Sequence, residues 1–237
     1  MALVLVTGAA TGLGLATAQA LAADGHDVVA HARNPSRLAG AGLLDQVRGA
    51  IYGNLAEHQE VVALAGQADE YGRFDAVIHN AGVLTGPDVL AVNTLAPYIL
   101  TARLRTPHRL VYLSSSMRRS GSANLQGLTT GRVSYEDSKL YVTALAAAIA
   151  SRCPETASHA VDPGWVPTRM GGPGATDDLR AGHETQVWLA TGQDIEPRTG
   201  GYWYHRHTQR PHPAAQDATF QAELIAGLEA RTGISLG

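Results

Sequence analysis

Short apolar runs alternate along the chain with longer segments that are rich in alanine and leucine. Seven runs have the composition of strands, the third and the last being the weakest: residues 2–7, 27–32, 49–53, 75–82, 108–115, 158–164 and 200–205. The other segments predict helices over residues 15–24, 57–72, 87–104, 135–151, 177–190 and 215–233. Strands that alternate with helices are typical of a mostly parallel sheet covered on both faces. We therefore predict an α/β, doubly wound Rossmann fold with about seven strands.

The chain shows no internal repeat and no linker long enough to separate domains. We expect one nucleotide-binding domain over residues 1–237. Beyond Pro163 the sequence becomes rich in glycine, proline and threonine, so we expect a substrate loop around residues 165–185. Pro97 interrupts the predicted helix 87–104 and either bends it or marks a later start.

Composition and charge narrow the class of protein. With 45% hydrophobic and 16% charged residues, the chain can bury a substantial core. The net charge of −3 gives no electrostatic reason to expect a nucleic-acid or membrane partner. The single cysteine, Cys153, excludes an internal disulfide and fits a reducing compartment. Because the amino terminus has neither a basic segment nor a long apolar run, we expect a soluble, cytoplasmic protein.

A glycine-rich turn separates the first predicted strand from the first helix. It contains Thr7, Gly8, Gly12 and Gly14. Glycine lets the backbone turn sharply and approach a diphosphate closely, and the amino end of the following helix attracts the anion. Glycine clusters also make ordinary tight turns, but the position after the first strand of a βαβ unit favours a nucleotide site. The spacing G-x-x-x-G-x-G differs from the commoner fingerprint G-x-G-x-x-G.

Tyr135 and Lys139 are four residues apart at the start of the predicted helix 135–151. On a helix this spacing stacks the two side chains on one face, one turn apart. The same spacing also occurs in ordinary solvated pairs, so it indicates chemistry only together with the rest of the chain.

Several motifs occur in a fixed order along the chain. They are T-G-x-x-x-G-x-G from Thr7, H-N-A-G at 79–82, Asn93, the serines that end the fifth strand, Y-x-x-x-K from Tyr135, and the Pro-Gly pair at 163–164. Together they resemble the short-chain dehydrogenase/reductase family, over a span from Thr7 to about Thr168. A weaker likeness connects residues 199–217 with the retinol-dehydrogenase-like branch.

The resemblance implies a catalytic set of Asn93, Ser115, Tyr135 and Lys139. Hydride transfer to a carbonyl needs a proton donor at its oxygen, and Tyr135 would be this acid/base. Lys139 would bind ribose hydroxyls and, with the charge of the oxidised nicotinamide, lower the pKa of the phenol from its usual value of about 10. Ser115 would donate to the substrate oxygen, and Asn93 would hold a water. Strand alternation sends Ser114 and Ser116 to the opposite face.

The resemblance also implies the contacts to a nicotinamide dinucleotide. These are Gly8, Thr11, Gly12, Leu13, Gly14, Asn80, Ala81, Gly82, Tyr135, Lys139, Pro163, Gly164, Val166 and Thr168. In dinucleotide folds an acid at the end of the second strand binds the ribose 2′-hydroxyl, whereas a nearby arginine accommodates a 2′-phosphate. Here Ala32 occupies the position of the acid and Arg33 follows it, which favours NADP(H) over NAD(H).

The residues expected to contact the adenine of the cofactor differ from the usual pattern of the family. Asn54, followed by Leu55, stands where an aspartate usually contacts the adenine amine. The amide oxygen of Asn54 would have to accept this hydrogen bond.

Other polar residues have ordinary interpretations. We expect Arg118 and Arg119 to be solvated loop residues rather than contacts to an anionic substrate. His205, His207 and His212 lack neighbouring cysteine or acid ligands, so we expect a polar loop and no metal site. Trp165 and Met170 either line an apolar pocket or pack under a lid.

The sequence thus predicts an NADP(H)-dependent oxidoreductase that interconverts a small-molecule carbonyl and an alcohol. The alternatives are a catalytically silent NADP(H)-binding regulator and an epimerase or dehydratase on the same scaffold. The small alanine face of helix 135–151 permits a homo-oligomer but equally suits packing on the sheet.

Overall fold

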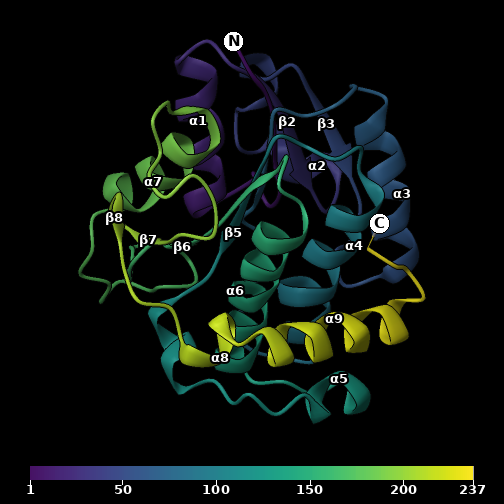
Figure 1. The fold of residues 1–237 in the computed structure, drawn as a ribbon. Coiled ribbons are helices and arrows are strands. Elements are labelled where there is room, and N and C mark those ends of the chain that lie inside the picture. Colours follow the sequence, from purple (N-terminus) through teal and green to yellow (C-terminus); the bar gives the residue numbers. More distant parts are fainter. Residues whose placement is uncertain (237) are drawn as a thin grey trace.

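A computed structural model describes residues 1–236 of the chain. The described residues form one eight-stranded sheet in the order β3-β2-β1-β4-β5-β6-β7-β8, in which only the last pair is antiparallel (Figure 1). The strands are β1 (Leu3–Val6), β2 (Asp27–Ala32), β3 (Gly49–Tyr52), β4 (Ala76–His79), β5 (Arg109–Leu113), β6 (Ala157–Asp162), β7 (Tyr202–Tyr204) and β8 (His207–Thr208). Strands β2 and β3 are added on one side of β1, and the strands from β4 onward are added on its other side. This change of direction confirms the predicted doubly wound α/β fold.

Helices cover both faces of the sheet. They are α1 (Gly12–Ala23), α2 (Pro35–Ala39), α3 (His58–Asp69), α4 (Ala96–Arg103), α5 (Gln126–Thr130), α6 (Tyr135–Arg152), α7 (Leu179–Thr191), α8 (Pro213–Gln216) and α9 (Ala218–Thr232). Short 3₁₀ turns occupy Leu44–Gln46 and Ser116–Ser120.

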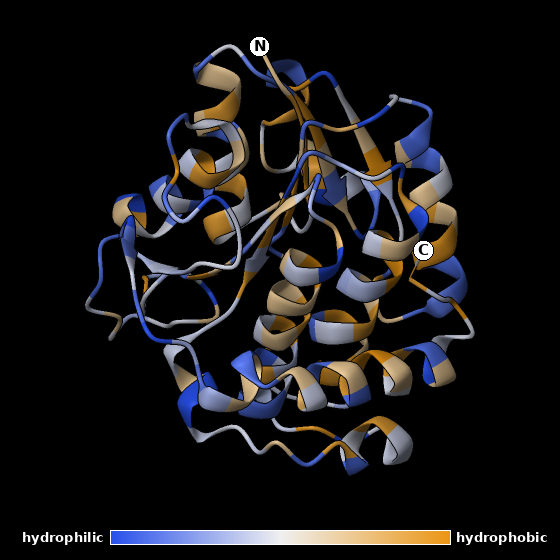
Figure 2. Ribbon diagram, viewed as in Figure 1, coloured by the Kyte–Doolittle hydropathy of each residue, from blue (hydrophilic) through white to orange (hydrophobic). Residues whose placement is uncertain are grey.

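Alternate strand residues enter two separate cores, as the strand period of two requires. Leu5 and Val29 pack in the core that includes residues of α3, α4, α6 and α9. Val4 and Val28 pack in the core that includes residues of α1 and α7. The strands are therefore apolar on both sides, and Figure 2 shows their hydrophobic colour between the two layers of amphipathic helices.

The predicted elements are present, with four differences. The strand 27–32 has the predicted bounds, whereas α2 and α5 were missed because each is only five residues long. An eighth strand turns back on β7, since residues 205–206 have positive φ values of 47° and 63°. The predicted helix 215–233 is broken at Asp217, whose Oδ1 accepts from the backbone N–H groups of Thr219 at 2.7 Å and Phe220 at 3.1 Å and so begins α9 afresh.

Helix α6 begins at Tyr135 for a local reason. The Ser134 side chain accepts a hydrogen bond from the Asp137 N–H at 3.0 Å, and Glu136 and Asp137 lie in the first turn, where acids favour the helix dipole. Most of the helix is buried between the sheet and α9, so its alanine face packs within this chain. The cap therefore fixes where Tyr135 and Lys139 enter the structure.

The segment that contains Asn93 is a π-helical turn, Ala91–Leu95, immediately before α4. The Ala96 N–H bonds to the Ala91 carbonyl, five residues back. Pro97 has no N–H, so the Asn93 carbonyl lacks the donor that a regular α-helix would supply. Pro97 was predicted either to bend the helix or to mark a later start. In the structure the π-helical turn leads directly into α4, so the helical backbone is distorted before Pro97 but continues through it.

Of the helices in the described part of the chain, none is both long enough and apolar enough to cross a membrane.

Candidate active site

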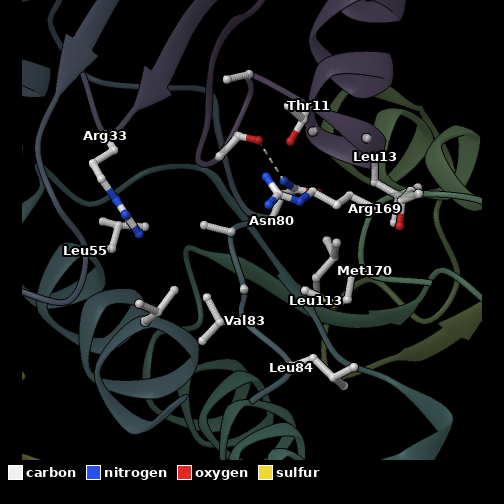
Figure 3. Close-up of a pocket in the computed structure, with 18 of the residues that line it drawn as sticks. Thr11, Leu13, Arg33, Leu55, Asn80, Val83, Leu84, Leu113, Arg169 and Met170 are labelled. Atoms are coloured by element: carbon white, nitrogen blue, oxygen red, sulfur yellow. Dashed lines mark hydrogen bonds between the residues drawn. The ribbon is translucent and has the colours of Figure 1, made fainter. Parts of the chain in front are cut away.

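A cavity of about 630 Å³ opens at the sheet edge where the parallel strands end (Figure 3). It is lined by the loops after β1 and β4, the neighbouring strands between which the order of strands reverses. This is the usual ligand position in open α/β sheets. Its wall comes from the loops after successive strands: residues 8–14, 31–37, 53–55, 80–85, 113–114 and 163–170, together with the first turn of α6.

The glycine turn approaches the loop after β4 too closely for side chains. A Cβ on Gly8 would lie 3.0 Å from the Ala81 Cα, and one on Gly14 would collide with the Asn80 amide nitrogen. Gly8 and Gly12 also have φ values of 67° and 57°, which favour glycine. These glycines leave the amino end of α1 open toward the cavity, as a bound phosphate requires.

His31, which the sequence analysis missed, holds the glycine turn in place. Its Nδ1 accepts from the Gly8 N–H at 3.1 Å, and its Nε2 donates to the Gly53 carbonyl at 3.0 Å. This pattern needs a neutral ring, and burial indeed lowers the pKa of His31. A polar residue inside the otherwise apolar strand β2 was the available signal.

Lys139 is the only lysine of the chain and is 4% exposed. Its ammonium donates to the Leu113 carbonyl at 2.8 Å and lies 5.4 Å from the centre of the Tyr135 ring. Burial lowers the pKa of Lys139 to about 8, although the Asp162 carboxylate opposes this shift. The predicted stacking of Tyr135 and Lys139 on one cavity wall is present.

Burial raises the pKa of Tyr135 to about 12, against a hydrogen bond from Ser115 that lowers it. Asp162 and Glu136 raise it further. The protein's own groups thus raise the pKa of the phenol, and its lowering by Lys139 together with the charge of an oxidised nicotinamide stays a prediction. Loss of hydration disfavours the phenolate more strongly than the neighbouring groups favour it. The phenol is held protonated, ready to donate.

The three serines after β5 have distinct surroundings. Ser114 is buried in the cavity wall, where its hydroxyl bonds Thr143 Oγ1 at 2.7 Å and contacts the Lys139 carbonyl at 3.3 Å. Ser115 is half-buried, its hydroxyl accepts from the Met117 N–H at 3.2 Å, and it lowers the pKa of the Tyr135 phenol, while Ser116 is exposed. Ser114 thus lines the cavity and braces α6, whereas Ser115 does not line it; contact of Ser115 with a substrate oxygen stays a prediction.

Asn93 is 2% exposed and uses its whole amide within the protein. Its Oδ1 accepts from the Val83 N–H at 2.8 Å, and its Nδ2 donates to the Val83 carbonyl at 2.9 Å and to Ser138 Oγ at 3.0 Å. A Cβ on Gly82 would lie 3.3 Å from this Oδ1 and 3.5 Å from Lys139 Nζ. The side chain therefore fixes the loop beside Lys139, and the binding of a water by Asn93 stays a prediction.

Most of the predicted cofactor contacts line the cavity: Gly8, Thr11, Gly12, Leu13, Gly14, Arg33, Asn54, Leu55, Asn80, Ala81, Gly82, Tyr135, Lys139, Pro163 and Thr168. Gly164 and Val166 do not, because Gly164 lies against the Asp177 side chain and Val166 is 3% exposed. The Asn54 Oδ1 already accepts from the Ala56 N–H at 3.2 Å, so an adenine amine would be its second donor.

Among the lining residues that were not predicted, Arg37 and Arg169 carry charge. Arg37 lies in the short helix α2, which Asn34 caps by accepting from the Arg37 N–H at 3.3 Å. An asparagine followed by proline is a helix-start signal that could have located Arg37 beside Arg33. Met170 lines the cavity, which is one of the two positions predicted for it. Trp165 does not line it and is 54% exposed on the loop.

Arg118 is fully buried, so the prediction that it is a solvated loop residue is wrong. Arg119 is exposed, as predicted. The Arg118 guanidinium donates to the carbonyls of Ser115 at 3.2 Å and Arg210 at 3.1 Å, and it lies 3.4 Å from the centre of the Tyr202 ring. Tyr202 and Arg210 belong to the carboxyl-terminal segment, which packs against the 116–120 turn. Arg118 thereby ties that segment to the backbone of Ser115.

The carboxyl-terminal histidines have structural contacts. The His205 ring stacks on Tyr204 with centroids 3.8 Å apart, and His212 caps α8 by accepting from the Ala214 N–H at 3.1 Å. Within residues 1–236, no group of three or more His, Cys, Asp or Glu side chains is placed to hold a metal ion.

Comparison with known proteins identifies the family. Residues 2–103 match the family model for short chain dehydrogenases. Short-chain dehydrogenase chyC from Penicillium rubens is 34% identical over 100% of this chain and 99% of its own length. A Streptomyces protein given the name daunorubicin C-13 ketoreductase DnrU is 31% identical over 97% of this chain and 92% of its own. The chain belongs to the short-chain dehydrogenase/reductase family of oxidoreductases, which confirms the resemblance found in the sequence.

Solved structures confirm the fold. A protein from Mycobacterium paratuberculosis superposes with a TM-score of 0.82 at 24% identity, over 100% of this chain and 95% of that one. A blue fluorescent protein from a metagenomic library, solved in complex with NADPH, gives a TM-score of 0.73 at 21% identity, over 86% and 95% of the two chains.

Replacing Arg118 by methionine should lower the free energy of unfolding by about 3 kcal/mol, because two buried carbonyls and the nearby Asp162 lose their cation. Urea unfolding measures the change. Arg119→Met, its exposed neighbour, should change stability by less than about 0.5 kcal/mol. Equal small effects of the two substitutions would contradict the bracing role of Arg118.

Proposed function

We propose that this protein interconverts a carbonyl and an alcohol by hydride transfer with NADP(H), with Tyr135 as the acid/base. The observation that carries the proposal is the grouping of Tyr135 and Lys139 in the wall of a cavity that the glycine turn also lines. A proton donor beside a dinucleotide cradle is what carbonyl reduction requires.

The residues present fit a nicotinamide dinucleotide. The glycine turn leaves a space that a Cβ would fill, and no aspartate or glutamate lines the cavity. Arg33 and Arg37 lie after β2, where the adenosine ribose of a dinucleotide binds, and Ala32 replaces the acid that would repel a 2′-phosphate. The NADPH complex of the metagenomic relative supports this preference by analogy of fold.

Thr11, Gly12 and Leu13 would hold the diphosphate with backbone N–H groups at the start of α1, and Lys139 would hold the nicotinamide ribose. When bound, the cofactor supplies or accepts the hydride. In the reductive direction the Tyr135 phenol donates its proton to the substrate oxygen as charge develops there, and Ser115 donates a second hydrogen bond. The Lys139 ammonium stabilises the phenolate that remains.

The surroundings of the phenol suggest the character of the substrate. Val83, Leu84, Leu113 and Met170 line the cavity, and Figure 3 shows these side chains grouped at one end of it. Leu84 and Met170 are 39% and 42% exposed, more than large apolar side chains usually are. We therefore propose a carbonyl on a bulky, apolar body, seated under the loop 165–185. The name of the Streptomyces relative, a ketoreductase, supports this proposal.

Tyr135→Phe should lower kcat for carbonyl reduction by about 10²- to 10⁴-fold, because it removes the proton donor. NADPH oxidation against a panel of ketones, aldehydes and quinones measures it. Tyr141→Phe is the matched control. Tyr141 lies on α6 like Tyr135, but it does not line the cavity, and its hydroxyl donates to the Asn124 carbonyl. It should leave kcat within about twofold. Unchanged turnover in Tyr135→Phe, or no turnover by the wild type across the panel, overturns the proposed reaction.

Reduction should be independent of pH below about 8, because Tyr135, with a pKa of about 12, and Lys139, with a pKa of about 8, both carry their protons there. Alcohol oxidation needs the phenolate, so its rate should rise about tenfold for each pH unit. Measurements of kcat/KM against pH, for carbonyl reduction and for alcohol oxidation, test these two pH dependences. A reduction rate that falls steadily as the pH rises toward neutrality contradicts a phenol held protonated.

Arg33→Ala should weaken NADPH binding by about 10- to 100-fold and leave NADH binding nearly unchanged, because a charge-assisted hydrogen bond contributes about 1.5–3 kcal/mol. Ala32→Asp should shift the preference toward NADH, since its carboxylate repels the 2′-phosphate. Dissociation constants from fluorescence titration decide the matter. An unchanged ratio of the two affinities in both variants contradicts the NADP(H) assignment.

A further inference from the structure

Arg169 is an exposed cation inside the candidate cofactor cavity. Figure 3 shows its side chain extending into the cavity toward the wall that carries Asn80, below Thr11 of the glycine turn. Among the residues that the structure describes, its guanidinium has neither a hydrogen bond nor an ion pair. A guanidinium that lines a cavity without any carboxylate can bind an anionic ligand through two parallel hydrogen bonds.

The backbone around Arg169 is held against the glycine turn. A Cβ on Gly12 would lie 3.2 Å from the Thr168 Cγ2, so the two segments are in close approach. The Thr168 carbonyl accepts from the Gly172 N–H at 2.8 Å, and its hydroxyl accepts from the Gly171 N–H at 3.2 Å. This tight turn directs residue 169 to the side of the cavity where α1 begins.

The charges that line the cavity are all positive. They are Arg33, Arg37, Lys139 and Arg169, with no carboxylate among the lining residues, although the chain as a whole carries a net charge of −3. Arg33 and Arg37 lie at the adenosine end, and Lys139 lies beside Tyr135 at the reacting end. Arg169 is the cation opposite the glycine turn, where the two phosphates of a dinucleotide meet the start of α1.

We propose that Arg169 binds the diphosphate of the nicotinamide dinucleotide and completes from the loop after β6 a site that the glycine turn forms from the opposite side. This inference rests on the proposed cofactor. It adds a side-chain anchor that recognises the part common to NADPH and NADH, in contrast to Arg33, which distinguishes the two.

Equilibrium binding tests this assignment without any turnover. Wild type, Arg169→Ala, Arg169→Lys and Arg33→Ala are titrated with NADPH, NADH and adenosine 2′-monophosphate, which has the 2′-phosphate but no diphosphate. Arg169→Ala should weaken NADPH and NADH by the same factor, about 10- to 100-fold, and leave adenosine 2′-monophosphate within about twofold. Arg169→Lys should recover part of the loss, since it keeps the charge but not the bidentate geometry. Raising the salt concentration should reduce the difference from wild type.

The control is Arg103→Ala, an exposed arginine of α4 that does not line the cavity, which should leave all three affinities unchanged. Unchanged NADPH and NADH affinities in Arg169→Ala overturn the proposal. So does a loss confined to NADPH, which would place Arg169 at the 2′-phosphate, or a raised KM for the carbonyl alone, which would place it on the substrate. A wild type that binds neither dinucleotide overturns it as well. Full turnover in Tyr135→Phe would defeat the proposed reaction and leave these binding results standing.

Discussion

The chain has a single lysine, and its ammonium is buried at the carboxyl end of β5. A charge in that position loses most of its hydration, so the surrounding groups have to replace it. The Leu113 carbonyl accepts from it, the Asp162 carboxylate attracts it, and the loop held by Asn93 leaves room for it beside Gly82. The cap at Ser134 and the π-helical turn before Pro97 are the local features that bring these groups together.

The same desolvation acts on the phenol next to it, and it shifts the pKa of the phenol in the opposite direction. Burial favours neutral Tyr135 and also neutral Lys139, so each group is moved toward the form in which it carries no charge. A neutral phenol is a proton donor, which is the form that the proposed carbonyl reduction requires of Tyr135. In the proposed function the positive lining of the cavity would attract the phosphates of the cofactor, and the apolar lining side chains would contact the substrate.

The fold was largely predictable because its strands are buried on both faces, which gives apolar runs such as residues 27–32 with clear ends. The family resemblance grouped Tyr135, Lys139, Ser115 and Asn93 into one predicted site, and of these Tyr135 and Lys139 line the cavity. Arg118 could not be placed, because its partners at Tyr202 and Arg210 are about 90 residues away and only the folded chain brings them near. The burial that raises the pKa of Tyr135 in the protein without a cofactor was not predictable for a related reason: burial depends on tertiary packing, which the four-residue spacing to Lys139 does not report.

Because Lys139 is the only lysine, incorporation of lysine labelled at the ε-carbon gives one NMR resonance whose titration reports this group alone. We predict a pKa of about 8 for Lys139 in the free protein and a clear shift of its resonance when NADPH is added. An ordinary pKa near 10.5, together with a resonance that does not respond to NADPH, would contradict a buried lysine at a dinucleotide site.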